Sequence, residues 1–436
     1  MNRERIKAKA MLLVVLTGFF IFLILPGTDR KTEEKNTEEA ERLVIPGEEE
    51  QTIEPEETFE IPASNASIRV LLLGDGGSIY HEDKELEREY PGELIYYEEE
   101  PGWVIVNEVP LEEYLQRVVP SEMPSAYSEE ALKAQAVCAR TYAVWQLQGY
   151  AYPEYEAHVD DSVSYQVYNQ VDVQESTDLA VATTAGQIMM YGDLPAKAYY
   201  FSTSCGSTTD ENIWEKGSSE DTPYITARRV SSVSSKKDLT DEEDFERFIE
   251  KKHPDDLEIS EPWYRWSCYV PLTQIEQNME KWVKERAGRT QDGIMSREGD
   301  TYAWTDIYTA GTVKEVAIVG RGAGGVAQEM LVTGEDGQMK IKYEYNIRLM
   351  LGIPGGEVHR NDGKVSQGGN LLPSGYFVLD PVEEEGKLAG YQVTGGGLGH
   401  GAGMSQNGAK TLAEEGYGYD EILKYFYEGI SLASLE

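Results

Sequence analysis

A single glutamate followed by an unusually polar helix is the part of this chain whose residue types are best suited to catalysis. Glu122 lies between Pro120 and Pro124 in SEMPSAY, a stretch that predicts a short loop. The apolar residues from 128 to 147 then predict a helix that is buried on most sides, with Ser128 as its N-cap. Polar side chains interrupt this apolar run at Lys133, Gln135, Arg140, Thr141 and Tyr142. Because buried polar groups need partners or a task, a carboxylate beside them is a candidate site for chemistry.

Two other segments are rich in polar groups where a core pattern predicts none. Residues 199–206, YYFSTSCG, predict a strand with a hydroxyl-rich end. Residues 395–409, GGGLGHGAGMSQNGA, predict a loop whose glycines let the backbone approach a ligand, followed by a helix N-terminus with free N–H groups. The loop matches neither a P-loop nor a dinucleotide fingerprint, and it lacks the Gly-x-Ser-x-Gly of a nucleophile elbow. We therefore expect both segments to form walls of a cleft beside Glu122.

The elements that must position these segments mix strands and helices without a regular alternation. Hydrophobic periodicity predicts strands at residues 67–75, 93–99, 102–109, 163–171, 187–191, 263–270, 374–380 and 389–397, and hairpin strands within 311–343. It predicts helices at residues 108–120, 128–147, 176–185, 239–252, 272–286, 345–351, 404–415 and 419–427. The predicted fold class is α+β, with mixed strands and helices around a buried catalytic helix.

Composition narrows the classes of partner. The 436 residues carry a formal net charge of −39, which excludes nucleic-acid binding and disfavours adsorption to anionic lipid. Such a charge keeps an exported domain soluble.

The three cysteines, Cys138, Cys205 and Cys268, form no CxxC pair and no disulfide framework. We expect Cys138 to be a packing residue, and a bridge from Cys138 to Cys205 remains an open alternative.

The N-terminal residues predict a membrane protein. Residues 1–27 hold a basic start and an apolar run of about 17 residues, near the lower limit for a membrane span. The charge asymmetry places the N-terminus in the cytoplasm, and LPGTD is a poor cleavage site, so we predict an uncleaved single-pass anchor in the cell membrane. Residues 28–65 predict a disordered acidic spacer. Residues 66–436 then form the extracytoplasmic catalytic region, with a charged insertion near 238–256.

Four motifs carry a resemblance to a known family. VVPSEMP, EALKAQAVCARTYA, YYFSTSCG and GHGAGMSQNGA, in this order, resemble the motifs of the stage II sporulation protein D (SpoIID/LytB domain) family, over residues from about 104 to 427. The resemblance implies a peptidoglycan lytic transglycosylase that cleaves peptide-free glycan between N-acetylmuramic acid (MurNAc) and N-acetylglucosamine (GlcNAc). It implies that Glu122 is the catalytic acid. It also implies a role in engulfment during sporulation, with stage II sporulation proteins P and M as partners and an amidase that removes the stem peptides first.

This chemistry needs only one carboxylate. A glycosidic oxygen must be protonated as its bond breaks, so the acid needs a pKa raised toward the working pH. Ordinary glycosidases use a second carboxylate for water or for a covalent intermediate. In a lytic transglycosylase the 6-hydroxyl of the sugar attacks instead, the same glutamate takes its proton, and the product has a 1,6-anhydro end. No second carboxylate shares the motif with Glu122, since Glu129 and Glu130 belong to the helix start.

The remaining candidate site residues are predicted to bind the sugar. They are Gln135, Arg140, Tyr142, Ser202, Ser204, His400, Ser405 and Gln406. For Gln135 and Arg140, pairing within the core and contact with substrate are alternatives that stay open. Ser405 has the N-cap of a helix as its alternative role.

No metal or other cofactor is predicted. Some family members bind zinc through a histidine and two cysteines, and His158 stands at the matching point of this chain. The cysteine positions, however, hold residues such as Ser164 and Gln170, and His158 with Asp160 and Asp161 is too few and too hard a ligand set. Two other functions remain as alternatives: a non-catalytic glycan-binding scaffold that recruits wall enzymes, and a hydrolytic muramidase.

Overall fold

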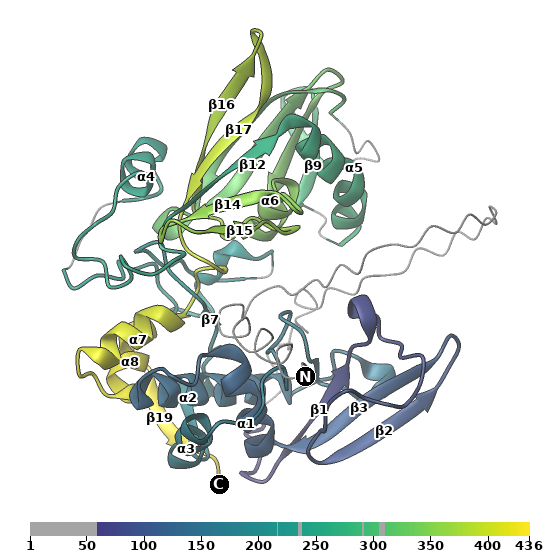
Figure 1. Ribbon diagram of the computed structural model, residues 1–436, viewed down its shortest axis with the longest axis vertical. Helices are drawn as coiled ribbons and strands as arrows, with labels where there is room; N and C mark the ends of the chain where they lie inside the picture. Colours follow the sequence, from purple (N-terminus) through teal and green to yellow (C-terminus); the bar gives the residue numbers. More distant parts are fainter. Residues whose placement is uncertain (1–58, 216, 234–237, 290–291, 305–309) are drawn as a thin grey trace, which may run out of the picture.

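Helices and several sheets share one mixed arrangement, so the α+β prediction is confirmed for the part of the chain that the structure describes (Figure 1). The computed structural model describes residues 59–215, 217–233, 238–289, 292–304 and 310–436. The helices are α1 (Leu111–Glu122), α2 (Glu129–Gln146), α3 (Glu175–Thr183), α4 (Glu242–Ile249), α5 (Leu272–Arg289), α6 (Glu344–Met350), α7 (Gln406–Glu414) and α8 (Tyr419–Phe426).

Three larger sheets are built mainly by antiparallel pairing. The first has the strand order β2 (Glu93–Glu98), β3 (Trp103–Pro110), β1 (Ser67–Leu72), β4 (Val159–Asp160). The second has the order β10 (Thr301–Ala303), β9 (Ile294–Glu298), β13 (Gln338–Lys342), β12 (Ala327–Gly334), β11 (Val313–Arg321). The third has the order β15 (Val365–Gln367), β14 (Glu357–Arg360), β8 (Trp266–Pro271), β17 (Lys387–Gly395), β16 (Phe377–Glu384).

Two small sheets lie among the helices. One pairs β7 (Tyr200–Phe201) in parallel with β18 (Met404–Ser405), so two segments that are far apart in the sequence run side by side. The other has the order β19 (Ser431–Ser434), β5 (Gln187–Tyr191), β6 (Leu194–Pro195). In Figure 1 the helices α1, α2, α3, α7 and α8 gather in the lower half, the second and third larger sheets fill the upper half, and β7 lies between them.

Helix α2 is the centre of the lower half. Most of its residues are buried, and it contacts α1, α3, α7, α8 and β5, which confirms the prediction of a buried helix. The alanines of its sequence allow these neighbours to approach closely. Ser128 occupies the N-cap position as predicted, but its side chain makes no capping hydrogen bond.

Two local predictions were wrong. Glu122 does not lie in a loop, because α1 continues through Pro120 and ends at Glu122. The alternating residues 163–171 do not form a strand, and instead they form an irregular segment. Backbone N–H groups of this segment find side-chain acceptors at the end of α1, so no ladder is needed to satisfy them: Gln170 and Val171 both donate to Ser121 Oγ, at 3.0 and 3.1 Å.

The predicted anchor at 1–27 and most of the predicted spacer at 28–65 lie outside the described residues. Within the described ranges, no helix is both long and apolar enough to span a bilayer. The charged segment near 238–256 packs in part against the rest of the chain. Its helix α4 buries Phe245, Phe248 and Ile249, and Asp256 is buried against Arg229 and Tyr264.

Candidate active site

Glu122 lies where the end of α1 meets β7 and the start of α7. The backbone N–H of Val167 donates to its Oε1 at 2.6 Å, the hydroxyl of Tyr200 also hydrogen-bonds to its carboxylate, and the amide of Gln406 lies close enough to stabilise its charge. Burial raises the pKa of Glu122 to about 7, although each of these hydrogen bonds stabilises the charged form and lowers it. The carboxyl is therefore balanced to hold or to release a proton near neutral pH.

A chain of polar side chains fixes the direction of the Tyr200 hydrogen bond. Gln166 is buried, and its Oε1 accepts from the hydroxyl of Tyr114 at 3.2 Å. Its Nε2 donates to the hydroxyl of Tyr200 at 3.0 Å and to the carbonyl of Ala139 at 3.4 Å. Because the Tyr200 oxygen accepts from Gln166, its own hydrogen is directed to Glu122.

Gln135 and Gln406 meet beside Glu122. The Nε2 of Gln406 donates to the backbone carbonyl of Glu122 at 3.1 Å and to Oε1 of Gln135 at 3.4 Å. Gln135 is completely buried, and its Nε2 has no hydrogen-bond partner among the described residues. For Gln135, pairing within the core and contact with substrate therefore both stay open, because its Oε1 accepts from Gln406 while its Nε2 has no partner in the described part of the chain.

A second buried carboxylate, Glu258, holds two of the predicted sugar-binding serines. The backbone N–H and hydroxyl of Ser204 and the hydroxyl of Ser405 all donate to it, the last at 2.6 Å. Burial raises the pKa of Glu258 to about 7, and these hydrogen bonds oppose the rise. Ser405 also accepts from the N–H of Gly408 at 3.3 Å, which confirms its role as the N-cap of α7.

Asn407 ties the three polar segments together. Its Oδ1 accepts from the hydroxyl of Tyr127 at 2.6 Å, and its Nδ2 donates to Oγ1 of Thr203 at 2.9 Å. Its backbone N–H donates to the carbonyl of Ser202 at 3.0 Å, and the hydroxyl of Ser202 lies 3.1 Å from that of Thr203. The stretch after Glu122, the end of β7 and the start of α7 are therefore joined by hydrogen bonds, and the cleft expected between them stays a prediction.

His400 has backbone partners at both ring nitrogens. The N–H of Ala402 donates to Nδ1 at 3.1 Å, so Nε2 carries the hydrogen and donates to the carbonyl of Tyr200 at 3.0 Å. Burial lowers the pKa of His400 to about 4, which keeps the ring neutral. In this arrangement His400 positions Tyr200, the donor to Glu122, and has no ring nitrogen left for a sugar.

Glycine is required where the loop enters β18. Gly403 has a φ of 77°, and a Cβ added there would lie 2.0 Å from the carbonyl oxygen of Tyr199. Any side chain at this position would push β18 away from β7. The glycine thus allows the close pairing that brings Gln406 to Glu122.

Arg140 is a core residue. It is fully buried, and its guanidinium makes two hydrogen bonds of 2.7 Å to the carboxylate of Glu112. Further bonds go to the carbonyls of Val181 and Gln187, at 3.3 and 3.2 Å. Of the two alternatives left open by the sequence, the core ion pair is the one that the structure contains. Tyr142 packs its ring edge-on against that of Tyr199, the residue before β7, with 6.3 Å between the ring centroids.

Several functional neighbours of Glu122 were missed by sequence reasoning. Gln166 and Val167 lie in the segment predicted as a strand, and Tyr200 lies in the hydroxyl-rich segment but was not singled out. Glu258 follows the charged segment and carries no local signal. Only its hydrogen bonds with Ser204 and Ser405 in the folded protein identify it as part of this network.

His158 and the three cysteines are buried in the protein. The Nδ1 of His158 accepts from the N–H of Arg69 at 2.9 Å. In the described part of the chain, no group of three His, Cys, Asp or Glu residues is arranged to hold a metal ion. Cys138, Cys205 and Cys268 are all buried as free thiols, so the alternative of a Cys138–Cys205 bridge is wrong.

Two family models match the chain. Residues 99–191 match the model described as stage II sporulation protein (SpoIID), and residues 208–403 match a domain of unknown function. The first match contains Glu122 and Val167, and the second contains Glu258.

Curated relatives cover most of the chain. The amidase enhancer of Bacillus subtilis is 29% identical over 73% of this chain, and the match spans only 40% of that relative. Stage II sporulation protein D of Bacillus subtilis is 28% identical over 76% of this chain and 76% of the relative. An uncharacterized protein of Brachyspira hyodysenteriae is 26% identical over 79% of this chain and 72% of the relative.

Proposed function

The chain carries a domain of the stage II sporulation protein (SpoIID) family, and on this premise we propose that it is a peptidoglycan lytic transglycosylase. Its role is cell wall remodelling in sporulation. It cleaves the glycan between MurNAc and GlcNAc and leaves a 1,6-anhydro end. The observation that carries the proposal is the surroundings of Glu122. Burial raises the pKa of its carboxyl, contacts with Val167, Tyr200 and Gln406 lower it, and the result is a pKa of about 7.

The reaction uses Glu122 twice. In its protonated form Glu122 donates its proton to the glycosidic oxygen as the bond to the MurNAc anomeric carbon breaks. The carboxylate then accepts the proton of the MurNAc 6-hydroxyl as that oxygen bonds to the same carbon. The proton count of Glu122 is restored at the end, and no water is consumed. A pKa near 7 suits both steps because neither protonation state is strongly disfavoured at neutral pH.

The position of Glu258 favours this reaction over hydrolysis. A muramidase needs a second carboxylate that reaches water or the anomeric carbon. Glu258 is a second buried carboxylate in the network, and it is completely buried while its oxygens accept hydrogen bonds from Ser204 and Ser405. It therefore holds the walls of the site together and does not activate a water molecule.

The proposed cellular role also rests on the similarity to the SpoIID family. We place the protein at the outer face of the cell membrane, anchored by residues 1–27, where it acts in engulfment beside stage II sporulation proteins P and M. One relative is named an amidase enhancer. By analogy, an amidase that removes stem peptides supplies the peptide-free strands that this chain cleaves.

The test is mass spectrometry of products from peptide-free glycan incubated with the purified chain. Wild type should release 1,6-anhydro ends, and Glu122→Gln should release none while it still binds the glycan. Glu129→Gln is the matched control, because Glu129 is an exposed carboxylate at the start of α2. Reducing ends from the wild type would support a muramidase, and binding without any product from wild type would support the scaffold.

A further inference from the structure

Three consecutive hydroxyl side chains follow β7, and they differ in exposure and in partners. Thr203 and Ser204 are each 1% exposed, whereas Ser202 is only partly buried. The hydroxyl of Ser204 donates to Glu258 within the core. The hydroxyl of Ser202 instead lies 3.1 Å from that of Thr203, and this is its one hydrogen-bond contact with the described residues. Ser202 is therefore the hydroxyl of this group that can reach a bound ligand.

A chain of hydrogen bonds decides which way the Ser202 hydrogen points. The hydroxyl of Tyr127 donates to Oδ1 of Asn407 at 2.6 Å, so Nδ2 of the same amide faces Thr203 and donates to its Oγ1 at 2.9 Å. An amide N–H cannot accept, so the Thr203 hydrogen goes to the other polar partner that the described residues offer it, Oγ of Ser202. The Ser202 oxygen thus accepts from Thr203, and its own hydrogen is left to point outward.

Ser202 is tied to the surroundings of Glu122 on two sides. Tyr200, two residues before Ser202, hydrogen-bonds to the Glu122 carboxylate. The backbone N–H of Asn407 donates to the carbonyl of Ser202 at 3.0 Å. The residue before it, Gln406, donates to the backbone carbonyl of Glu122 at 3.1 Å. A sugar held at Glu122 can therefore place one of its substituents at the Ser202 hydroxyl.

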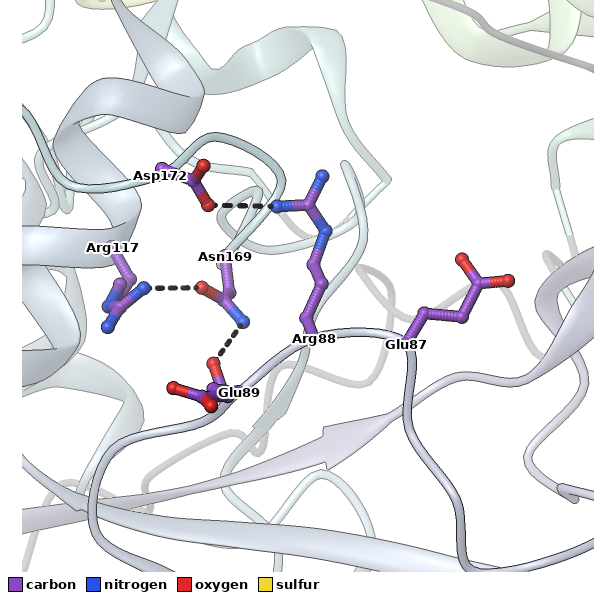
Figure 2. A pocket seen from close by; sticks show the side chains of 6 residues that line it. All are labelled: Glu87, Arg88, Glu89, Arg117, Asn169 and Asp172. Atoms are coloured by element: carbon purple, nitrogen blue, oxygen red, sulfur yellow. Dashed lines mark hydrogen bonds and ion pairs between the residues drawn. The ribbon is translucent and has the colours of Figure 1, made fainter.

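A charged hollow of about 450 Å³ beside α1 offers no comparable donor (Figure 2). Nη1 of Arg117 donates there to Oδ1 of Asn169 at 3.2 Å. Arg88 lies 3.6 Å from a carboxylate oxygen of Asp172. Both guanidiniums therefore already face partners, and the carboxylates of the lining outnumber them. The lining residues are Glu87, Arg88, Glu89, Arg117, Asn169 and Asp172.

The substituent that matches an outward hydroxyl hydrogen is an uncharged acceptor. The chain has a net charge of −39, and Glu122 and Glu258 lie in the same network as Ser202, so a carboxylate is disfavoured at this point. A sugar hydroxyl brings a hydrogen of its own, whereas the carbonyl oxygen of an acetamido group only accepts. The acetamido carbonyl of an N-acetylated sugar therefore fits the direction of the Ser202 hydrogen.

We propose that Ser202 donates its hydroxyl hydrogen to the acetamido carbonyl oxygen of a sugar in the strand bound at Glu122. Tyr127, Asn407 and Thr203 are positioning residues, which direct this hydrogen without touching the sugar. This inference rests on the proposed function and adds a specificity to it. A sugar that has lost its acetyl group offers an ammonium, which cannot accept a hydrogen bond, so the strand loses this contribution to binding.

The experiment measures glycan binding by the full chain in the Glu122→Gln background, which prevents turnover. The probes are N-acetylated peptide-free strands and the same strands after removal of their acetyl groups. Ser202→Ala should weaken binding of the N-acetylated strands by roughly fivefold, the size of one neutral hydrogen bond. It should change binding of the de-N-acetylated strands by less than about twofold. The matched control is Ser232→Ala at an exposed serine, which should leave both affinities unchanged.

Variants of Thr203 test the positioning role. Thr203→Val removes the hydroxyl that orients Ser202 and should weaken binding of the N-acetylated strands alone, by about threefold. Thr203→Ser keeps the hydroxyl and should restore the affinity. In the double variant Ser202→Ala, Thr203→Val, the loss should equal that of Ser202→Ala, because Thr203 acts through Ser202. Thermal melting of each variant checks that it is folded.

Equal losses on both kinds of strand in Ser202→Ala, or no loss on either, would overturn the proposal. Additive losses in the double variant would contradict the positioning role of Thr203. The proposed function can fail separately. If wild type releases no anhydro ends while Ser202→Ala weakens the N-acetylated strands alone, the reaction is wrong and the contact at Ser202 stands. If wild type releases anhydro ends and Ser202→Ala binds both strands as wild type does, only this inference fails.

Discussion

The backbone N–H of Val167 donates to Oε1 of Glu122 across 2.6 Å. This contact links the end of a helix to a segment 45 residues later in the chain. It stabilises the carboxylate, whereas burial of the same group stabilises the acid, and the two effects leave the pKa at about 7. The pKa of Glu122 therefore depends on a segment that contributes only a backbone N–H, at Val167.

The first prediction concerns the pH dependence of cleavage. The step that breaks the glycosidic bond needs protonated Glu122, so kcat/KM should fall above about pH 7, roughly tenfold for each further pH unit. Initial rates of anhydro-end release across a pH series check this. A rate that stays constant well into the alkaline range would show that Glu122 is not the acid.

The second prediction concerns the donor on Tyr200. Tyr200→Phe removes a hydrogen bond that lowers the pKa of Glu122, so the alkaline limb of the profile should move to higher pH. kcat should also fall, by roughly tenfold, because the carboxyl loses one of the groups that orient it. The matched control is Tyr417→Phe at an exposed tyrosine, which should leave the profile unchanged.

The third prediction separates the core role of Arg140 from a role in catalysis. Glu112→Gln leaves the buried guanidinium without its carboxylate and should lower the free energy of unfolding by roughly 3 kcal/mol. The folded fraction should keep kcat/KM within about threefold of wild type, the span of about 0.6 kcal/mol in the transition state. Urea unfolding and rates at a permissive temperature check both parts.

The control for this variant is Glu129→Gln at the exposed pair with Lys133, which should cost less than about 1 kcal/mol. If Glu112→Gln were as stable as wild type, the ion pair would have little structural role. A specific loss of catalysis in a fully folded Glu112→Gln protein would return Arg140 to the list of substrate contacts.

The fourth prediction concerns stability and pH. Glu122, Asp161 and Glu258 each have a folded-state pKa raised to about 7 by burial, above the ordinary values of 4.5, 3.8 and 4.5. Between the two values these three carboxyls bind more protons in the folded state, so their contribution to stability should fall as pH rises from about 5 to about 7. His158 and His400, whose pKa values burial lowers to about 4, oppose part of this fall and leave a smaller net decrease.

A Glu258→Gln variant should show a smaller fall, since one of the three groups no longer titrates. The difference for a completely buried group is at most about 3 kcal/mol across the window. Melting temperatures at about pH 5 and about pH 8 measure it for both proteins. An unchanged slope in Glu258→Gln would show that Glu258 is already ionised throughout this range.

Much of the local structure follows from the sequence. The helix that starts at Glu129, the strand at Gln187–Tyr191 and the helix that starts at Tyr419 were all predicted, because hydrophobic periodicity and capping residues act within a few residues of each other. The alternation at 163–171 misled for a physical reason. Alternation shows that a segment is half-buried, but it does not show where its N–H groups find acceptors.

The sequence by itself determined the catalytic candidate, the three polar segments and their expected meeting around Glu122. Only the tertiary structure decided how that carboxyl is tuned and which neighbours are structural. Glu258 binds Ser204 and Ser405 at separations of 54 and 147 residues, and Arg140 binds Glu112 across two helices. A pKa is set by burial and by every donor within hydrogen-bond reach, and these are properties of positions in space that no local pattern of residue types encodes.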